Sequence, residues 1–303
     1  MRDSEALLPV ERWVALVNVL LLCSWLPLVP RLPSARWFAA VHLGALALPW
    51  LLRRVQAPLS QVTAGLRETY PLLWTAMFWS ELGLRHDLLP EPINDPLVAG
   101  WDLQLFGTHL NLSWVETMPS TAMSEVMQGA YFTYYLMLAA IPLVLLAGRD
   151  LAIRREVVLR IAVSYLGCFL IYSYFPVVGP RELWPIYQGD LTSGFFYQLN
   201  LGLRSAGDSL GTAFPSSHTV GAVTFAWIAW RTGRPGIASL VTVLAGLIAL
   251  ATVYTQNHFA IDTVAGLVVA GFLQAVVVPS LTGLVRQRQP HSVLLPSGLP
   301  EAT

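Results

Sequence analysis

The chain has 303 residues, of which 55% are hydrophobic and 12% are charged, and its formal net charge is zero. This composition is far more apolar than that of soluble domains, which indicates that water is not the main solvent of the protein. All 18 basic residues are Arg, and they form no tract long enough for nucleic-acid binding, so we expect no nucleic-acid partner.

Apolar stretches of about 17–24 residues recur along the chain, and each can cross a hydrocarbon layer about 30 Å thick. We therefore predict an all-α fold, a polytopic transmembrane helical bundle of about eight spans. The first span lacks a clear cleavage site, so we expect a retained helix rather than a signal peptide. The predicted spans are 13–30, 37–52, 69–84, 124–147, 156–175, 213–230, 236–254 and 260–279.

The Arg residues are distributed unevenly between the two sides that these spans define. Thirteen fall at the termini and the even-numbered connections, and five fall in the odd-numbered connections. By the positive-inside rule both termini are cytoplasmic, so the connections 85–123 and 176–212 face outward. Basic residues that are all Arg and spans rich in Ala are typical of a GC-rich bacterial genome. We therefore predict a multi-pass protein of a bacterial inner membrane, with an extracytoplasmic site.

The sequence divides into three regions. Residues 1–60 form a predicted N-terminal transmembrane hairpin, residues 61–282 form the main membrane domain, and residues 283–303 form a polar tail predicted to be disordered. Within the main domain, residues 85–123 mix acidic and aromatic side chains, as a segment lying along the membrane interface would. An ordinary acidic surface loop is the alternative for that segment.

The first candidate site is the sequence Pro-Ser-Ser-His at 215–218, which opens a predicted span. The hydroxyls of Ser216 and Ser217, the free N–H groups of the helix start and the helix dipole would all favour a bound phosphate. The alternative is that one of these Ser residues caps the helix and that His218 is an ordinary interfacial residue.

The second candidate site is the pair His258 and Asp262, at the start of the last span. A separation of four places both side chains on one helical face. An imidazole is a competent nucleophile toward phosphorus when a carboxylate fixes its tautomer and stabilises the cation that develops. Because a chain of this composition contains such a pair by chance with a probability of roughly one third, the pair alone indicates little.

The third candidate is Arg181, just beyond the fifth span. A guanidinium can bind phosphate oxygens in bidentate fashion, although a lone Arg near a span end can also be an interfacial anchor. All three candidate sites lie on the predicted outer side, where neighbouring helices could bring them together. Their joint occurrence is therefore more informative than any one of them.

With these residues the chain resembles the type 2 phosphatidic acid phosphatase superfamily of lipid phosphate phosphatases and phosphotransferases. The second motif of that family reads Pro-Ser-Gly-His, and its third contains His-x-x-x-Asp. Residues 215–218 and 258–262 occupy those places, and the resemblance covers roughly residues 150–280. It implies a phosphatase-like core of six helices, which two N-terminal spans precede in this chain.

The resemblance also implies the roles of the residues. His258 attacks phosphorus to give a phosphohistidine, Asp262 supports it, and His218 protonates the leaving group. Arg181 binds the phosphate together with Ser216 and Ser217, and neither a cofactor nor a metal takes part.

The chain departs from the family pattern at several positions. Tyr174 stands where the first motif has Lys, Arg181 is followed by Glu rather than Pro, Thr252 stands where the third motif has Arg, and Ser217 replaces Gly. The expected phosphate site therefore retains one clear cation, which Arg204 could supplement.

Two segments are similar to the inositol phosphorylceramide synthase (aureobasidin-resistance) branch, namely Phe-Pro-Val-Val-Gly-Pro-Arg at 175–181 and Trp-Asp-Leu-Gln-Leu-Phe-Gly at 101–107. This resemblance implies an inositolphosphotransferase-like enzyme of sphingolipid metabolism that moves a phospho-headgroup from a phospholipid donor to a lipid alcohol. Hydrolysis of a lipid phosphomonoester is the nearest alternative. A transporter with an intramembrane His/Asp relay, a metal-assisted hydrolase and an inactive lipid-binding relative are alternatives of other classes.

Overall fold

The computed structural model describes residues 7–55, 60–88, 94–147, 150–207, 209–232 and 235–286. Over these residues the fold is helical, with one isolated β-bridge between Val177 and Thr212, which confirms the predicted all-α bundle. Short 3₁₀ turns lie at Leu26–Leu28 and Gly189–Thr192, and a π-helical turn lies at Leu273–Val277. The α-helices are α1 (Pro9–Trp25), α2 (Ala35–Arg54), α3 (Ser60–Leu88), α4 (Asp95–Phe106), α5 (Leu110–Thr117), α6 (Thr121–Ala147), α7 (Leu151–Tyr174), α8 (Pro180–Leu183), α9 (Phe195–Gly207), α10 (Ser217–Thr232), α11 (Pro235–Tyr254), α12 (Ala260–Phe272) and α13 (Val278–Arg286).

Several helices are long and apolar enough to cross a membrane, so the chain is an integral membrane protein. Within the described residues five such segments occur, namely Pro9–Leu28, Ala35–Arg54, Leu151–Tyr174, Pro235–Tyr254 and Ala260–Gly283. The remaining predicted spans, 69–84, 124–147 and 213–230, fall on helices α3, α6 and α10, which are not among these five. The total of about eight spans therefore stays a prediction.

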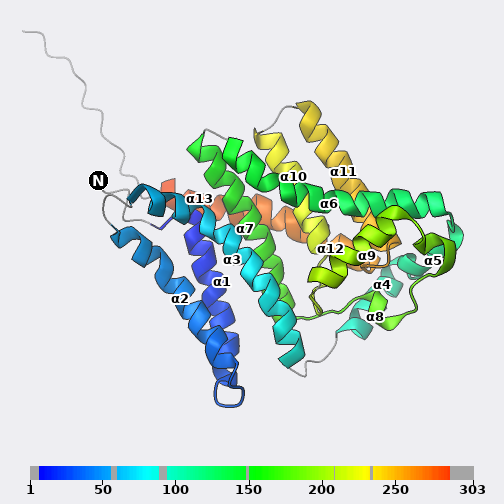
Figure 1. Cartoon of the computed structure of the whole chain (residues 1–303), viewed down its shortest axis with the longest axis horizontal. Helices are drawn as coiled ribbons and strands as arrows, with labels where there is room; N and C mark the ends of the chain where they lie inside the picture. The colour runs from blue at the N-terminus through cyan, green and yellow to red at the C-terminus, as the bar shows by residue number, and fades with distance from the viewer. Residues whose placement is uncertain are drawn as a thin grey trace, which may run out of the picture.

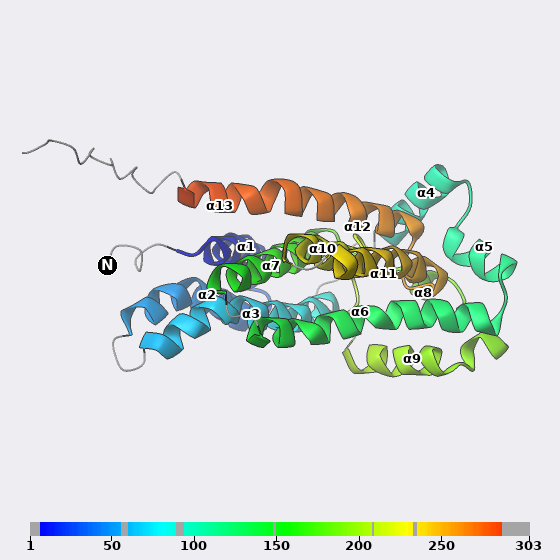
Figure 2. The same cartoon turned by 90° about the horizontal axis from the view of Figure 1, so that it is seen from above.

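The helices that connect the spans gather at one end of the bundle. Helices α4, α5 and α8 lie at that end in two perpendicular views, and α13 ends at the opposite end (Figures 1 and 2). Helices α4 and α5 occupy the segment predicted to lie at the interface, of which residues 89–93 are outside the described residues. Helix α13 runs to Arg286, and the rest of the predicted disordered tail is also outside them.

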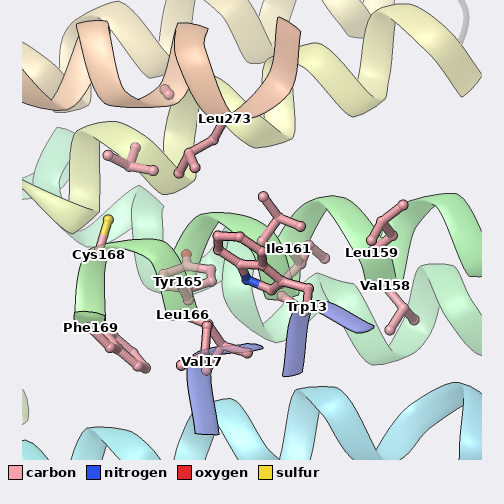
Figure 3. Packing of buried hydrophobic residues seen from close by; sticks show 14 of the residues in the cluster. Trp13, Val17, Val158, Leu159, Ile161, Tyr165, Leu166, Cys168, Phe169 and Leu273 are labelled. Atoms are coloured by element: carbon pink, nitrogen blue, oxygen red, sulfur yellow. The ribbon is translucent and has the colours of Figure 1, made fainter. Parts of the chain in front are cut away.

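Helix α7 is the centre of the bundle. Every residue from 157 to 169 is buried, on all sides of the helix, as expected for a helix that is enclosed by others. Figure 3 shows Val158, Ile161 and Leu166 of α7 beside Trp13 and Val17 of α1. The same core includes residues of α10, α11 and the π-helical turn. Helix α7 therefore fixes the position of the loop that follows it.

The predicted N-terminal hairpin packs against the rest of the bundle in two ways, directly through contacts of α1 with α7 and α13, and through α3, which packs against α1, α2 and α7. Buried polar contacts hold these helices together. Glu11 of α1 accepts two hydrogen bonds of 2.8 Å from the guanidinium of Arg67 in α3. His42 of α2 lies 3.0 Å from Asn18 of α1 and 3.1 Å from Glu81 of α3. Such contacts associate helices where lipid supplies no hydrophobic driving force.

Candidate active site

Backbone hydrogen bonds join the three segments that carry the candidate residues. The N–H of Val177 donates to the carbonyl of Gly211 at 3.3 Å, and the N–H of Ala213 donates to the carbonyl of Val177 at 2.8 Å. The N–H of Ser216 then donates to the carbonyl of Asp262 at 3.0 Å. The loop after α7, the loop before α10 and the start of α12 therefore form one connected unit.

Two buried carboxylates of α4 accept hydrogen bonds from backbone N–H groups of this unit and so hold it in position. Asp95 accepts hydrogen bonds from the N–H groups of Val178 at 3.0 Å and Gly179 at 2.7 Å, in the loop after α7. Asp102 accepts one of 2.9 Å from the N–H of Ile261, in the first turn of α12. Because the first N–H groups of a helix have no partner within the helix, Asp102 caps α12 from a second helix. The predicted interfacial segment thus positions two of the three candidate sites.

His258 and Asp262 lie close together, as their spacing predicts. Nδ1 of His258 is 3.4 Å from Oδ2 of Asp262, and the same carboxylate oxygen accepts a hydrogen bond of 2.9 Å from the N–H of Phe259. Asp262 is fully buried. An ionised carboxylate only accepts hydrogen bonds, so this contact favours a proton on Nδ1 and leaves the lone pair on Nε2.

His218, in the first turn of α10, faces His258. Its Nδ1 lies 3.5 Å from Nε2 of His258, although 40 residues separate the two in sequence. The imidazole is held between aromatic rings of α6, with ring centroids 4.6 Å from Tyr131 and 4.4 Å from Tyr134. The structure therefore brings His218, His258 and Asp262 into a single row. These contacts are long for hydrogen bonds, as catalytic contacts often are before a substrate is bound.

Two Arg side chains face the same space. Arg181 donates a hydrogen bond of 2.9 Å to the carbonyl of Thr255, and its Nε is buried without a partner among the described residues. Arg204 of α9 donates to Oδ1 of Asn257 at 3.2 Å. Burial, with the nearby charge of Arg204, lowers the pKa of Arg181 to about 10, so Arg181 remains cationic at neutral pH. Two cations that repel each other form a site that an anion would stabilise.

The two Ser residues of the 215–218 sequence occupy different places. The hydroxyl of Ser216 is fully buried and accepts hydrogen bonds from the N–H of Thr219 at 3.3 Å and from its hydroxyl at 3.2 Å, so it caps α10. Ser217 borders the cavity described next. Both predicted phosphate contacts stay predictions, and the geometry places Ser217 nearer to an incoming ligand.

These side chains line one end of a cavity of about 560 Å³. This volume is within the range of about 300–1,000 Å³ that is usual for small-molecule sites. The charged and polar side chains that line it include Arg181, Arg204, Asn257, Ser217, His218 and His258, and the acidic Glu182 beside Arg181. The remainder is largely apolar and is lined by residues of α3, α6 and α7, by Leu203 of α9 and by residues between Ser209 and Ala213. A ligand of this cavity would combine an anionic group with an apolar group.

Helix α12 can approach α10 this closely because residue 266 is Gly. A Cβ atom at Gly266 would lie 2.9 Å from the carbonyl oxygen of Ser216 and 3.0 Å from Cβ of Thr219. We expect Gly266→Ala to separate α12, which directly follows His258, from α10, which carries His218. Overpacking of this kind costs about 1–3 kcal/mol. We therefore expect a lower Tm in detergent and a kcat reduced about tenfold or more.

The matched control is Gly271→Ala in the same helix, because a Cβ atom at Gly271 would have no neighbour within 4 Å. Both variants remove a glycine from α12 and should raise its helix propensity alike. An equal kcat for the two variants would contradict the proposed close approach at Gly266.

Asp95, Tyr131 and Tyr134 were not predicted from the sequence to be site residues. Asp102 was predicted only to belong to the interfacial segment 85–123 and to its 101–107 motif, and Arg204 only to supplement the charge of Arg181. Among the described residues, no group of three or more His, Cys, Asp or Glu side chains is arranged to hold a metal ion.

Comparison with known protein families identifies one match. The family model of the PAP2 superfamily matches residues 101–276, more than half of the chain. This segment extends from α4 into the π-helical turn and includes every candidate site residue. No curated protein and no solved structure matches the chain significantly.

Proposed function

The chain belongs to the PAP2 superfamily of phosphatases and phosphotransferases, and we propose that it is a membrane lipid phosphotransferase that forms a phosphohistidine at His258. The cavity is the observation that carries this proposal. Its polar end holds two His and two Arg side chains, and its other end is apolar, as a lipid with a phosphate headgroup requires. By the distribution of Arg along the chain, the reaction takes place at the extracytoplasmic face.

The reaction needs two steps. In the first, Nε2 of His258 forms a bond to phosphorus while the bond to the leaving oxygen breaks, and His218 donates a proton to that oxygen. In the second, the oxygen of an acceptor hydroxyl forms a bond to phosphorus, the N–P bond breaks, and His218 takes the hydroxyl proton. Asp262 holds the orientation of His258 and stabilises its positive charge. Both His residues return to their starting states.

The charges of the site favour a phosphodiester donor. Tyr174, at the position of the family's Lys, donates a hydrogen bond of 2.7 Å to the carbonyl of Leu20 in α1. The hydroxyl of Thr252, at the position of the family's Arg, lies 2.9 Å from that of Thr263. Neither Tyr174 nor Thr252 is among the described residues that line the cavity. A site with fewer cations suits a diester, with one negative charge, better than a monoester dianion. This supports headgroup transfer, as in the inositol phosphorylceramide synthase branch.

Arg181 and Arg204 are expected to carry substrate binding. We expect Arg181→Gln to reduce kcat/KM by about 10²-fold, since it removes a preorganised cation from a water-poor site. We expect Arg204→Gln to have a smaller effect of the same kind. In the free enzyme Arg181 loses its charge as the pH rises through about 10, so kcat/KM of the wild type should fall above that pH. The pH profile of Arg181→Gln should lack this alkaline fall.

The control for these variants is Arg36→Gln, because Arg36 is exposed at the start of α2, on the same predicted side of the membrane, and does not line the cavity. Initial rates measured against substrate concentration between pH 7 and 11 separate KM from kcat. An alkaline limb that persists in Arg181→Gln would contradict the proposed role of the Arg181 charge.

The function itself is tested with purified protein and phospholipids labelled in the headgroup phosphate. One set carries a phosphomonoester, and the other carries a phosphodiester offered together with ceramide or diacylglycerol. A labelled new phospholipid that depends on His258 supports transfer, whereas free phosphate that depends on His258 indicates the alternative, a lipid phosphate phosphatase. No product that depends on His258 from either set would contradict both and leave the inactive or transporter alternatives. Activity that a chelator abolishes would indicate the metal-assisted hydrolase.

A further inference from the structure

One wall of the cavity comes from a helix that the family match does not include. The match begins at residue 101, whereas α3 spans Ser60–Leu88 and contributes four residues to the cavity lining. These four are Leu72, Thr75, Ala76 and Trp79. They are spaced three, four and seven residues apart, so they share one face of the helix. The apolar end of the cavity is therefore a feature of this chain and not of the matched segment alone.

The opposite face of α3 has another environment. Leu73 is 63% exposed and Met77 is 48% exposed, and neither is among the residues that line the cavity. Large apolar side chains at such exposure are stable in contact with lipid. Helix α3 therefore has two apolar faces, and only the face with Ala76 borders the cavity.

The orientation of α3 places one end of this wall near the cationic end of the cavity and the other end far from it. Trp79 is tied to the segment that follows Arg204, because its Nε1 donates a hydrogen bond of 2.8 Å to the carbonyl of Gly207. The hydroxyl of Ser209 donates to the carbonyl of Trp79 at 2.9 Å. Of the four α3 residues that line the cavity, Trp79 is thus the one nearest the cationic end. Leu72 lies seven residues earlier, about 10 Å along the helix axis.

The walls formed by α6 and α7 extend along the cavity in the same direction as the α3 wall, away from the cationic end. The ring of Trp79 lies 5.8 Å, centroid to centroid, from that of Phe169 in α7. Leu138 of α6 and Ile161 of α7 also border the cavity. Ala76 has the smallest side chain of the α3 wall and lies between its two ends. A chain that enters past Trp79 must pass Ala76 before it reaches Leu72.

We propose that the cavity face of α3 binds the hydrocarbon chain of the substrate and that the small side chain of Ala76 sets how long a chain the enzyme accepts. The proposal rests on the proposed function, since it assumes that the phosphate lies at His258. A larger residue at position 76 should block the far part of the cavity and leave the near part open. Long chains should then be rejected, and short ones accepted.

The test compares Ala76→Phe with Met77→Phe, which adds an aromatic ring one residue away on the lipid-facing side. For each variant, kcat/KM is measured with alkyl methyl phosphodiesters whose alkyl chain ranges from butyl to hexadecyl. We expect Ala76→Phe to lose about tenfold or more with the longest chains, and less than about twofold with the butyl ester. Met77→Phe should keep the wild-type profile. An unchanged profile in Ala76→Phe, or the same change in both variants, would overturn the proposal.

A second measurement does not depend on turnover. An alkyl phosphate with a photoreactive diazirine at the chain end is crosslinked to the wild type and to His258→Ala, and the labelled positions are mapped by mass spectrometry. We expect crosslinks at the cavity face of α3 that unlabelled alkyl phosphate reduces. Crosslinks confined to Leu73 and Met77, or unaffected by the competitor, would contradict the proposal. A third outcome would be crosslinks on the cavity face of α3 that the competitor reduces, in a protein that shows no turnover dependent on His258. That outcome would reject the proposed function but support the binding of a hydrocarbon chain by α3.

Discussion

His258→Ala is expected to abolish turnover of every lipid phosphate, with a loss of roughly 10⁴-fold or more in kcat. The reason is that no other side chain in the row can form the bond to phosphorus. Asp262 is buried behind His258, and its Oδ2 is occupied by the N–H of Phe259. His218 lies between the aromatic rings of α6, and no carboxylate among the described residues orients it as Asp262 orients His258.

The measurement that checks this expectation combines steady-state rates with trapping of the intermediate. Brief incubation with substrate labelled at phosphorus, followed by alkaline denaturation, should leave label on the wild-type protein, because phosphohistidine is labile to acid and stable to base. His258→Ala and the larger His258→Gln should carry no label. Since His258 is buried, the Tm of each variant in detergent shows whether a loss of label reflects misfolding. Label that persists in well-folded His258→Gln would identify a different nucleophile.

The fold class and the proximity of the candidate pair His258 and Asp262 follow from local features of the sequence. Apolar stretches of bilayer length predicted the helices, and the spacing of four predicted the contact between His258 and Asp262. The contact of His218 with His258 has no such local signal, because α10 and α11 separate the two residues and only their packing brings them to 3.5 Å. That expectation came from the placement of both residues on one predicted side of the membrane and from the family resemblance, and spacing alone did not supply it.

The positioning residues could not be predicted because their roles depend on contacts between distant segments. Asp102 accepts a hydrogen bond from Ile261, 159 residues later in the chain, and Asp95 accepts one from Gly179, 84 residues later. In the sequence both are acidic residues of an amphipathic segment, where exposure to water is the ordinary expectation. The structure buries both completely, because backbone N–H groups of the site need acceptors there.

Hydropathy predicted only the middle of α3, since the predicted span is 69–84 and the helix extends over Ser60–Leu88. This helix contains Arg67, Glu68, Glu81 and Arg85, so its mean hydropathy is low for a span. Several of these charges have partners on neighbouring helices, as in the contact between Arg67 and Glu11. Paired charges inside a bundle cost much less than charges facing lipid, and an average along the sequence cannot distinguish the two cases.

His218→Ala is expected to have an effect that depends on the leaving group. With an alkyl or lipid leaving group, removal of the general acid should lower the rate of the first step by roughly 10²–10⁴-fold. With methyl p-nitrophenyl phosphate, a phosphodiester, the phenolate leaves without a proton, so the first step should stay close to the wild-type rate. The second step still needs His218 to take the proton of the acceptor, and phosphohistidine should therefore accumulate.

Rapid mixing of His218→Ala with methyl p-nitrophenyl phosphate measures both steps at once. A burst of p-nitrophenolate that approaches one equivalent per active site, followed by a slow phase, is the expected result. His258→Ala should give neither phase, so the two variants distinguish an acid from a nucleophile at positions whose ring nitrogens lie only 3.5 Å apart. An equal loss with alkyl and p-nitrophenyl substrates would mean that His218 holds the substrate or His258 in place and does not transfer the proton. The aromatic contacts of Tyr131 and Tyr134 would then serve to orient a binding residue.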